Sequence, residues 1–453
     1  MSEAQIIHEI EQNQEEYINF LCDLIQAESY NPPGNEKNVA LIIDKYLKGA
    51  GINSELYPFG NNRANLVAYL NDNLEGKNLL YNGHMDVVPP GNEEEWKYPP
   101  LSATIKGSKK KKKLFGRGAA DMKAALAAMV ISLKILKKLK VELTGNLIVN
   151  AVADEETGGK LGTGASLDKY LKSIKCDFIV IGETSGLAPL GKAIAVGEKG
   201  HLNLKITTKG ISCHSMLPTM GKNGIEMMSE IIQNLDKIEN YMPKINPPLS
   251  YNKLKELLGQ FFPDKQTFEK ILNEQRILQD ILQSLTHFTK SFTMINGGIK
   301  ENVIPDKCEG ILDFRLLPGQ SPETIINALK NMIIEELGYS VKSELIGSSE
   351  EIFVYIEIYR QGDGSYWENW EKSQTLQDLR NIIEQVYRAK PIILLSPGAT
   401  DAHYYRNSNY CQQTVIFGPG ALTNMHATNE SIEIQDFINA IKVYSLFAYN
   451  YLK

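Results

Sequence analysis

From Asn78 onward, the chain alternates short apolar runs, rich in branched residues, with longer stretches in which apolar residues recur at helical spacing. Short branched runs are typical of buried strands, and the stretches between them have the length and periodicity of helices. The alternation therefore predicts an α/β fold in which helices flank a central sheet.

Polar residues directly follow five of these apolar runs. The runs and their followers are 78–81 with His84, 146–153 with 154–156, 177–181 with Glu183, 391–395 with 396–401, and 414–417 with His426. Ligands of open α/β sheets collect at the carboxyl ends of strands. We therefore expect these five polar clusters to share one pocket.

The length of 453 residues exceeds what one hydrophobic core usually organises, so we expect two domains or one large insertion. The pattern changes between residues 191 and 359, where predicted strands at 202–207 and 310–316 are separated by helical stretches. We therefore assign residues 1–190 and 360–453 to one discontinuous domain. Residues 191–359 form the predicted inserted domain.

Composition excludes several classes of partner. With 43% hydrophobic and 23% charged residues, the chain matches an ordinary folded protein rather than a disordered one. The formal net charge of -6 opposes broad attraction to nucleic acid or to anionic lipid. Nothing approaches the roughly 18 consecutive apolar residues that a membrane span requires. We therefore expect a small-molecule partner, and no nucleic acid or membrane.

Cysteine usage bears on the compartment. The five cysteines are scattered, form no CxxC pair and leave one without a partner in any disulfide scheme. Reduced thiols are the simpler interpretation. The N-terminal segment is acidic and amphipathic, unlike a signal peptide. We therefore expect a cytoplasmic protein.

Five consecutive lysines at 109–113 fall where a turn between two strands is expected. The run could contact an anionic partner, but like charges repel and prefer water, which favours a solvated loop tip. We assign no function to it.

His84 and Asp86 form a His-Met-Asp sequence directly after a predicted strand. On extended backbone both side chains point the same way. A metal-bound imidazole needs an acceptor for its second nitrogen, which a neighbouring carboxylate supplies. His84 is thus a candidate metal ligand with Asp86 as its orienting group. A strand-end histidine beside a solvated aspartate is the alternative.

Asp121 stands at the start of a predicted helix that runs through residues 124–136. Aspartate is a common helix N-cap, which would explain this residue without any function. A carboxylate here could equally bridge two cations, because each of its oxygens can bind a separate metal. This residue alone leaves both interpretations open.

Three adjacent carboxylates, Asp154, Glu155 and Glu156, end an apolar strand, where burial makes unpaired anions costly. One of them can bind metal while its neighbour stays free as a general base. An acidic loop in solvent is the alternative. Glu183 and His426 repeat the pattern of a lone ligand-type residue after a strand. Together, two imidazoles and several carboxylates suit zinc, with manganese or cobalt as possible substitutes.

Five ordered motifs resemble those of a known zinc hydrolase family: GHMDVVP, FGRGAADMKAALAA, VADEETGG, IGETS and MHATNE. That family includes acetylornithine deacetylase, succinyl-diaminopimelate desuccinylase, aminoacylase and glutamate carboxypeptidase, and the motif set looks most like the first two. The resemblance covers nearly the whole chain. It implies a catalytic domain with a mixed central sheet, and an inserted α+β domain of ferredoxin-like form that closes the site and makes a homodimer.

The resemblance also implies roles for single residues. Two zinc ions per subunit would share a bridging carboxylate, in the ligand sets His84, Asp121, Glu183 and Asp121, Glu156, His426. Asp86 would support His84. Two cations about 3.5 to 4 Å apart would lower the pKa of a bridging water and polarise the carbonyl. Glu155 would take the proton of that water and then protonate the leaving amine.

Residues 210–224 resemble the family segment in which a histidine from the partner subunit completes the site. His214 is the candidate for oxyanion stabilisation; a histidine satisfied by local backbone is the alternative. Asn302 and Arg315 resemble family substrate contacts, and arginine suits a bidentate grip on a carboxylate. A surface salt bridge is the alternative for Arg315.

The segment after the fourth apolar run would line the substrate end through backbone and hydroxyl groups, with Gly398 and Thr400 as contacts. His403 follows, where many deacetylase-like relatives carry arginine, which leaves specificity open. Glu183, rather than aspartate, favours the deacylase and carboxypeptidase branches over some aminopeptidase-like relatives.

We therefore expect metal-dependent hydrolysis of the amide bond in a small N-acyl amino acid. A carboxypeptidase or dipeptidase that cleaves a short peptide is the alternative within the same family. A catalytically inactive dimeric scaffold that binds a small ligand is the alternative from another class. It predicts a missing ligand or base, yet every expected position is filled.

Overall fold

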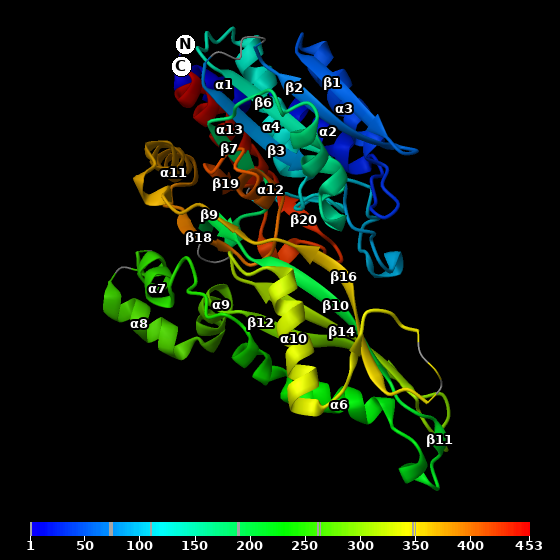
Figure 1. The fold of residues 1–453 in the computed structure, drawn as a ribbon. Helices are drawn as coiled ribbons and strands as arrows, with labels where there is room; N and C mark the ends of the chain where they lie inside the picture. Colours follow the sequence, from blue (N-terminus) through cyan, green and yellow to red (C-terminus); the bar gives the residue numbers. More distant parts are fainter. Residues whose placement is uncertain are drawn as a thin grey trace.

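The computed structural model describes residues 2–71, 76–108, 111–187, 191–260, 262, 264–346, 348 and 350–453. The chain is arranged in two layers, each built on its own sheet (Figure 1). The upper layer holds both termini and a large mixed sheet, and the lower layer holds a five-stranded sheet. The predicted α/β fold with a second α+β part is confirmed.

The larger sheet has the order β1-β2-β6-β3-β7-β19-β9-β17, and β8 and β18 also pair with β9. In chain order its strands are β1 (Asn53–Phe59), β2 (Arg63–Tyr69), β3 (Asn78–His84), β6 (Asn146–Val152), β7 (Phe178–Ile181), β8 (Gly186–Leu187), β9 (Gly191–Glu198), β17 (Ser365–Tyr366), β18 (Ile392–Ser396) and β19 (Thr414–Ile416). All five predicted apolar runs are strands. β3, β6, β7 and β19 are parallel and end at one edge.

The fourth run, β18, has the opposite direction, because β9 is antiparallel to β19 and parallel to β18. Its carboxyl end therefore does not share the edge of the other four strands, although residues 396–401 line the same cleft as the other polar clusters. The loop that follows β18 carries residues 396–401 back to the ends of the other four strands. There the Asn82 side-chain amide donates to Asp401 at 3.2 Å.

Helices cover the larger sheet and carry most of the core. They are α1 (Glu3–Gln12), α2 (Gln14–Gln26), α3 (Glu36–Gly49), α4 (Lys123–Lys138), α5 (Ala165–Asp168), α11 (Gln374–Tyr387), α12 (Ala402–Asn407) and α13 (Ile434–Leu452). The helix α4 is apolar almost all round, because it packs against β3 and β6 as well as against α2 and α13. Its N-terminus is thereby held against the strand ends.

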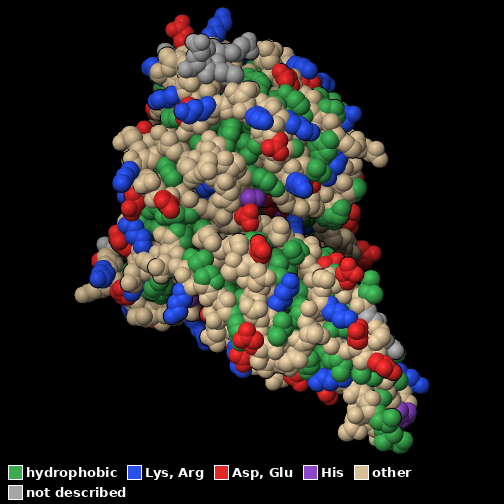
Figure 2. Space-filling view, in the orientation of Figure 1, with side chains coloured by type: hydrophobic (Ala, Val, Ile, Leu, Met, Phe, Trp, Pro, Cys, Tyr) green, Lys and Arg blue, Asp and Glu red, His purple; other side chains and the backbone are tan. Residues whose placement is uncertain are grey.

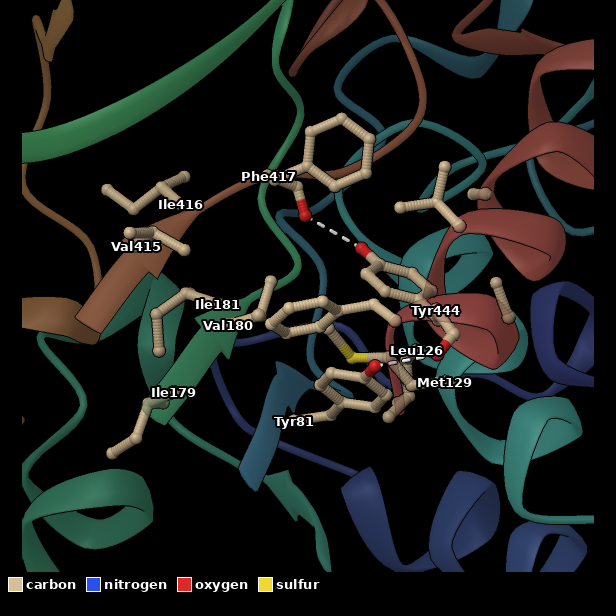
Figure 3. Close-up of a cluster of buried hydrophobic side chains, with 14 of the residues drawn as sticks. Tyr81, Leu126, Met129, Ile179, Val180, Ile181, Val415, Ile416, Phe417 and Tyr444 are labelled. Atoms are coloured by element: carbon tan, nitrogen blue, oxygen red, sulfur yellow. Dashed lines mark hydrogen bonds between the residues drawn. The ribbon is translucent and has the colours of Figure 1, made fainter. Parts of the chain in front are cut away.

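Two buried tyrosines fix α13 across these strands (Figure 3). The Tyr81 hydroxyl on β3 donates to the carbonyl of Tyr444, and the Tyr444 hydroxyl donates to the carbonyl of Phe417, each at 2.7 Å. Buried phenols need such partners, since an unpaired hydroxyl in the core is costly. Leu126 and Met129 of α4 pack beside them. The core thus fixes the relative positions of α4, β3 and the end of β19.

A glycine beside the strand ends allows α4 to approach. A Cβ atom on Gly182, directly after β7, would lie 2.8 Å from the Ala125 Cβ of α4. That separation is too short for two carbon atoms, so a side chain at this position would push the helix away. The absence of a side chain brings the start of α4 next to Glu183.

The lower layer is a sheet of order β12-β14-β10-β16-β15 with two helices on one face. Its elements are β10 (Gly200–Lys209), α6 (Gly224–Asn234), β12 (Thr289–Gly297), β14 (Lys307–Leu316), α10 (Pro322–Leu337), β15 (Val341–Lys342) and β16 (Phe353–Gly362). Burial alternates along β10 and β14, so one face packs on α6 and α10 and the other carries polar residues.

Two further groups extend this layer. The short strands β11 (Cys213–His214) and β13 (Val303–Ile304) pair at its far tip. The helices α7 (Tyr251–Gly259), α8 (Lys265–Glu274) and α9 (Arg276–Thr286) lie at the opposite side. Their buried leucines belong to the same apolar cluster as the larger sheet, and α7 contacts β18. These helices therefore connect the two layers.

The chain crosses between the two sheets at Lys199 and again between Gly362 and Ser365. The division into two domains stays a prediction. Sheet membership favours boundaries at these crossings over the predicted 191 and 359, because β9 pairs with β18 and β19 of the larger sheet.

A separate three-stranded sheet holds the strands that flank the lysine run in the sequence, β4 (Thr104–Lys106) and β5 (Lys113–Phe115), together with β20 (Ser431–Glu433). β4 and β5 are antiparallel, and Lys106 pairs with Lys113. Strands therefore lie on both sides of the predicted turn, and the turn itself includes Lys109 and Lys110, which lie outside the described residues. In the part of the chain that the structure describes, every helix is too short or too polar to span a bilayer.

Candidate active site

The five residues predicted as metal ligands lie together at the edge where β3, β6 and β7 end. Two sets of donor atoms form there, His84 with Asp121 and Glu183, and Asp121 with Glu156 and His426. Within each set, all donor atoms lie within 4.8 Å of one another, and Asp121 belongs to both.

The two carboxylate oxygens of Asp121 face different histidines. Its Oδ1 lies 3.0 Å from His84 Nε2, and its Oδ2 lies 3.1 Å from His426 Nε2. Glu183 lies 3.4 Å from the first histidine nitrogen, and Glu156 lies 3.1 Å from the second. Tetrahedral zinc with bonds of about 2.0 to 2.2 Å needs donors about 3.3 to 3.6 Å apart. The residues therefore fit two ions of this size after shifts of a few tenths of an ångström.

The charges of the cluster also favour the binding of cations. Asp121, Glu156 and Glu183 are buried, and Glu155 is nearly so. Burial, and next the charge of Asp121, raise the pKa of Glu183 to about 7. Burial, and next the charge of Glu183, raise the pKa of Glu155 well above its usual range. So many carboxylates in one desolvated place are stable only with positive charge among them.

Asp121 does not cap α4, so the capping alternative is wrong. The helix begins at Lys123, and the residue before its first turn is Met122, which makes no capping hydrogen bond. The Asp121 carboxylate is occupied with the two histidines. What fixes its backbone is Glu430, whose Oε1 accepts the N–H groups of Ala120 and Asp121 at 2.7 and 3.0 Å.

Asp86 has a wider positioning role than the prediction gave it. The Nδ1 atom of His84 lies 2.9 Å from the Asp86 backbone oxygen and 3.6 Å from its carboxylate. That carboxylate accepts the N–H groups of Glu155 and Glu156 at 3.3 and 3.1 Å, and the Asn31 amide at 2.8 Å. Asp86 therefore holds the turn that carries a ligand and the predicted base.

Of the three adjacent carboxylates, Asp154 faces away from the ligand sets. Its oxygens accept the hydroxyl of Thr157 at 2.8 Å and the N–H of Leu161 at 2.9 Å, and Arg63 lies 3.2 Å away. Its φ of 75° is a strained left-handed conformation for aspartate, which these contacts hold. Asp154 thus shapes the turn, and Glu155 and Glu156 face the site.

A cleft of about 540 Å³ opens in front of the carboxylates, between the larger sheet and the polar face of the smaller one. Figure 2 shows a hollow at this level, where histidine and acidic side chains gather. Glu155, Gly398, Thr400 and Arg315 line the cleft, and their roles as base and substrate contacts stay predictions. The hydroxyl and backbone N–H of Thr400 both donate to the carboxylate of the buried Glu198. Glu198 thereby holds the loop that follows β18 in place.

Comparison with known proteins identifies the family. The model of peptidase family M20/M25/M40 matches residues 80–450. The chain belongs to this family. The M20 chain is accordingly a hydrolase of amide bonds, and its candidate ligand sets lie within the matched region.

Relatives and solved structures match over nearly the full length. The chain is 28% identical to a probable succinyl-diaminopimelate desuccinylase of Staphylococcus aureus (strain MSSA476), over 97% of this chain and 98% of the relative. The M20 metallo-carboxypeptidase Sso-CP2 of Sulfolobus solfataricus has a TM-score of 0.74 at 22% identity, covering 96% and 99%. The di-peptidase Dug1p of Saccharomyces cerevisiae has a TM-score of 0.77 at 16% identity, covering 99% and 98%.

Two predicted site residues of the M20 chain lie elsewhere. His214 is exposed on β11, where its Nδ1 accepts the N–H of Met216 at 3.0 Å, and it pairs in register with Val303. The Asn302 carbonyl accepts the N–H of Ser215 at 3.1 Å on the same tip. Neither residue lines the cleft of its own chain. The structure therefore brings these two together, but not with the ligand sets.

Three cleft residues had no signal in the sequence. His201 and Asn203 on β10 and Arg360 on β16 line the cleft from the smaller sheet. His201 and Arg360 follow no motif, and an alternating strand pattern predicts only that one face is polar. His201 lies between Arg315 and Gly362 in the sheet register.

Proposed function

We propose that the protein hydrolyses the amide bond of a small N-acyl amino acid in a metal-dependent reaction. The observation that carries this proposal is the pair of donor sets that share Asp121, beside the buried Glu155. Arg315 across the cleft offers a guanidinium for a substrate carboxylate. A cleft of about 540 Å³ suits a small molecule rather than a folded protein.

Two zinc ions are the proposed cofactors, with cobalt or manganese as possible substitutes. His84, Asp121 and Glu183 would hold one, and Asp121, Glu156 and His426 the other. A donor set of imidazole and carboxylate suits zinc. When bound, the ions supply Lewis acidity toward the attacking water and the scissile carbonyl.

Glu155 is the proposed general base and acid. It lies 4.0 Å from the ligand nitrogen of His84 but belongs to neither donor set, so its carboxylate is free to take a proton. It would accept the proton of the attacking water and then donate it to the leaving nitrogen. A pKa raised by burial favours holding the proton between these two steps.

A homodimer is the proposed assembly, with His214 and Asn302 completing the cleft of the partner. Exposed apolar side chains support it, namely Met216 and Met220 at the tip and Met294, Ile295 and Ile299 in and just after β12. β12 is an edge strand, and an apolar edge left uncovered favours association. His214 would then stabilise the oxyanion in trans.

Mixing two inactive variants tests this assembly. In hybrid dimers of His214→Ala and Glu155→Gln, one of the two sites contains an intact base and an intact histidine. Equal mixing should therefore restore about a quarter of the activity of the unsubstituted dimer. No restoration, with sedimentation showing hybrid dimers, would contradict a histidine supplied in trans.

A substrate panel tests the reaction. Zinc-loaded protein should cleave N-acetyl amino acids or N-succinyl-diaminopimelate faster than dipeptides. The alternative is a carboxypeptidase or dipeptidase, which agrees with the names of the two solved structures. Activity on peptides alone would replace the deacylase proposal with this one.

A further inference from the structure

The cleft wall that faces the carboxylates carries two arginines on different strands. Arg315 of β14 pairs in register with His201 of β10, and Arg360 of β16 pairs with Asn203. The two arginines are therefore two strand spacings apart, about 10 Å between backbones. All four side chains line the cleft.

The two guanidinium groups differ in their partners. Arg315 donates from Nε and Nη2 to the carboxylate of Asp313, at 3.0 and 3.3 Å. Arg360 donates from Nη2 to the backbone carbonyl of Glu156. Among the described residues, no carboxylate forms an ion pair with Arg360. Its charge is thus open to an anion in the cleft.

His201 lies beside both arginines without adding a charge. Burial, and next the charges of Arg360 and Arg315, lower the pKa of His201 to about 4. Its Nε2 atom is buried and has no hydrogen-bond partner among the described residues. A Cβ atom on Gly362 would lie 2.6 Å from the imidazole, so the glycine makes room for the ring. The neutral ring therefore offers an unused polar atom between two cations.

We infer that the substrate carries two carboxylates, the first bound by Arg315 and the second by Arg360 with His201 beside it. The assignment rests on the proposed function for the reaction, whereas the binding of a dicarboxylate can be measured without it. Two separated guanidinium groups favour two anionic groups over one, since each charge-assisted pair forms only with its own partner.

Pairs of substrates that differ by one carboxylate test the second subsite. One pair varies the acyl group, and the other varies the side chain of the amino acid. An N-succinyl amino acid differs from its N-butyryl analogue by one carboxylate, and an N-acyl glutamate differs in the same way from its glutamine analogue. The zinc-loaded protein should prefer the dicarboxylate in at least one pair, by on the order of 10-fold in kcat/KM. No preference in either pair would overturn the inference.

Arg360→Met should remove that preference by slowing only the dicarboxylate substrate, and Arg360→Lys should keep part of it. Arg276→Met is the matched control, because Arg276 is exposed on α9 and lies outside the cleft. Equal slowing of both substrates of a pair would show that Arg360 only fixes the Glu156 turn, and would overturn the subsite.

Binding separates this inference from the reaction. Calorimetry with glutarate and butyrate should show tighter binding of glutarate to the zinc-loaded protein, and Arg360→Met should abolish the difference. If no amide of the panel is cleaved, the proposed function fails, while the glutarate result still decides the subsite. Equal affinities for the two acids would reject it.

Discussion

Replacing Glu430 by alanine tests how the shared ligand Asp121 is held. Glu430 is buried, and its Oε1 accepts the N–H groups of Ala120 and Asp121. Its Oε2 pairs with Arg117 at 2.8 Å, and both side chains of this ion pair are almost fully buried. The substitution therefore leaves a buried cation and two buried N–H groups without their acceptor.

The expected loss is about 4 kcal/mol in the free energy of unfolding. Removing one partner of a buried ion pair costs about 3 to 5 kcal/mol, because the remaining charge stays desolvated. The two N–H groups would add about 1 kcal/mol or more each, but water entering the space of the missing side chain offsets part of this cost. Because the Asp121 backbone would also shift, zinc affinity should fall by about 10- to 100-fold.

Chemical denaturation and zinc competition with a chelator measure the two effects. Glu433→Ala is the control, since Glu433 is exposed at the start of α13 and makes no capping bond. It should change stability by less than about 0.5 kcal/mol. A Glu430→Ala protein within 1 kcal/mol of the original, with unchanged zinc affinity, would refute this role of Glu430.

Three further substitutions follow from the site. Glu155→Gln should abolish turnover while zinc content stays unchanged, and substantial activity would exclude Glu155 as the base. Asp86→Asn should lower kcat/KM by about 10- to 100-fold. The NH2 group of asparagine would face the backbone N–H of Glu155 or Glu156, which the Asp86 carboxylate accepts, so one hydrogen bond of the turn would be lost. Unchanged kinetics would contradict this role. For His201, the folded pKa of about 4 lies below the usual 6.5, so the unfolded chain binds more protons between these values. The free energy of unfolding should therefore fall by up to about 3 kcal/mol from pH 6.5 to pH 4, relative to His201→Gln. Parallel pH curves would show that His201 titrates normally.

The positions of the ligand-type residues could be predicted because each follows a strand. His84 ends β3, and Glu156 and Glu183 come shortly after β6 and β7. Parallel strands bring their carboxyl ends to one edge, so spacing along the chain was enough to predict proximity. Asp121 is different, since its helix-start position also suits a cap, and only the structure excludes that role.

Contacts that do not follow from the ends of parallel strands could not be predicted. Glu430 lies more than 300 residues from Asp121, and no spacing rule relates a loop carboxylate to two backbone N–H groups. Arg360 lies near the end of β16. The strand pattern predicts on which face of the sheet its side chain lies, but not that the cleft lies opposite that face. The direction of β18 also escaped prediction, because it depends on pairing with β9, whose place in the larger sheet was not expected.

The metal content of the protein tests the central claim most directly. Plasma mass spectrometry on the purified chain should find two zinc ions per subunit, and Asp121→Ala should lose both sites because it removes the ligand that they share. Hydrolysis of an N-acetyl amino acid should disappear with the metal and return when zinc is restored. Two ions still bound in Asp121→Ala, or full activity without metal, would contradict the account.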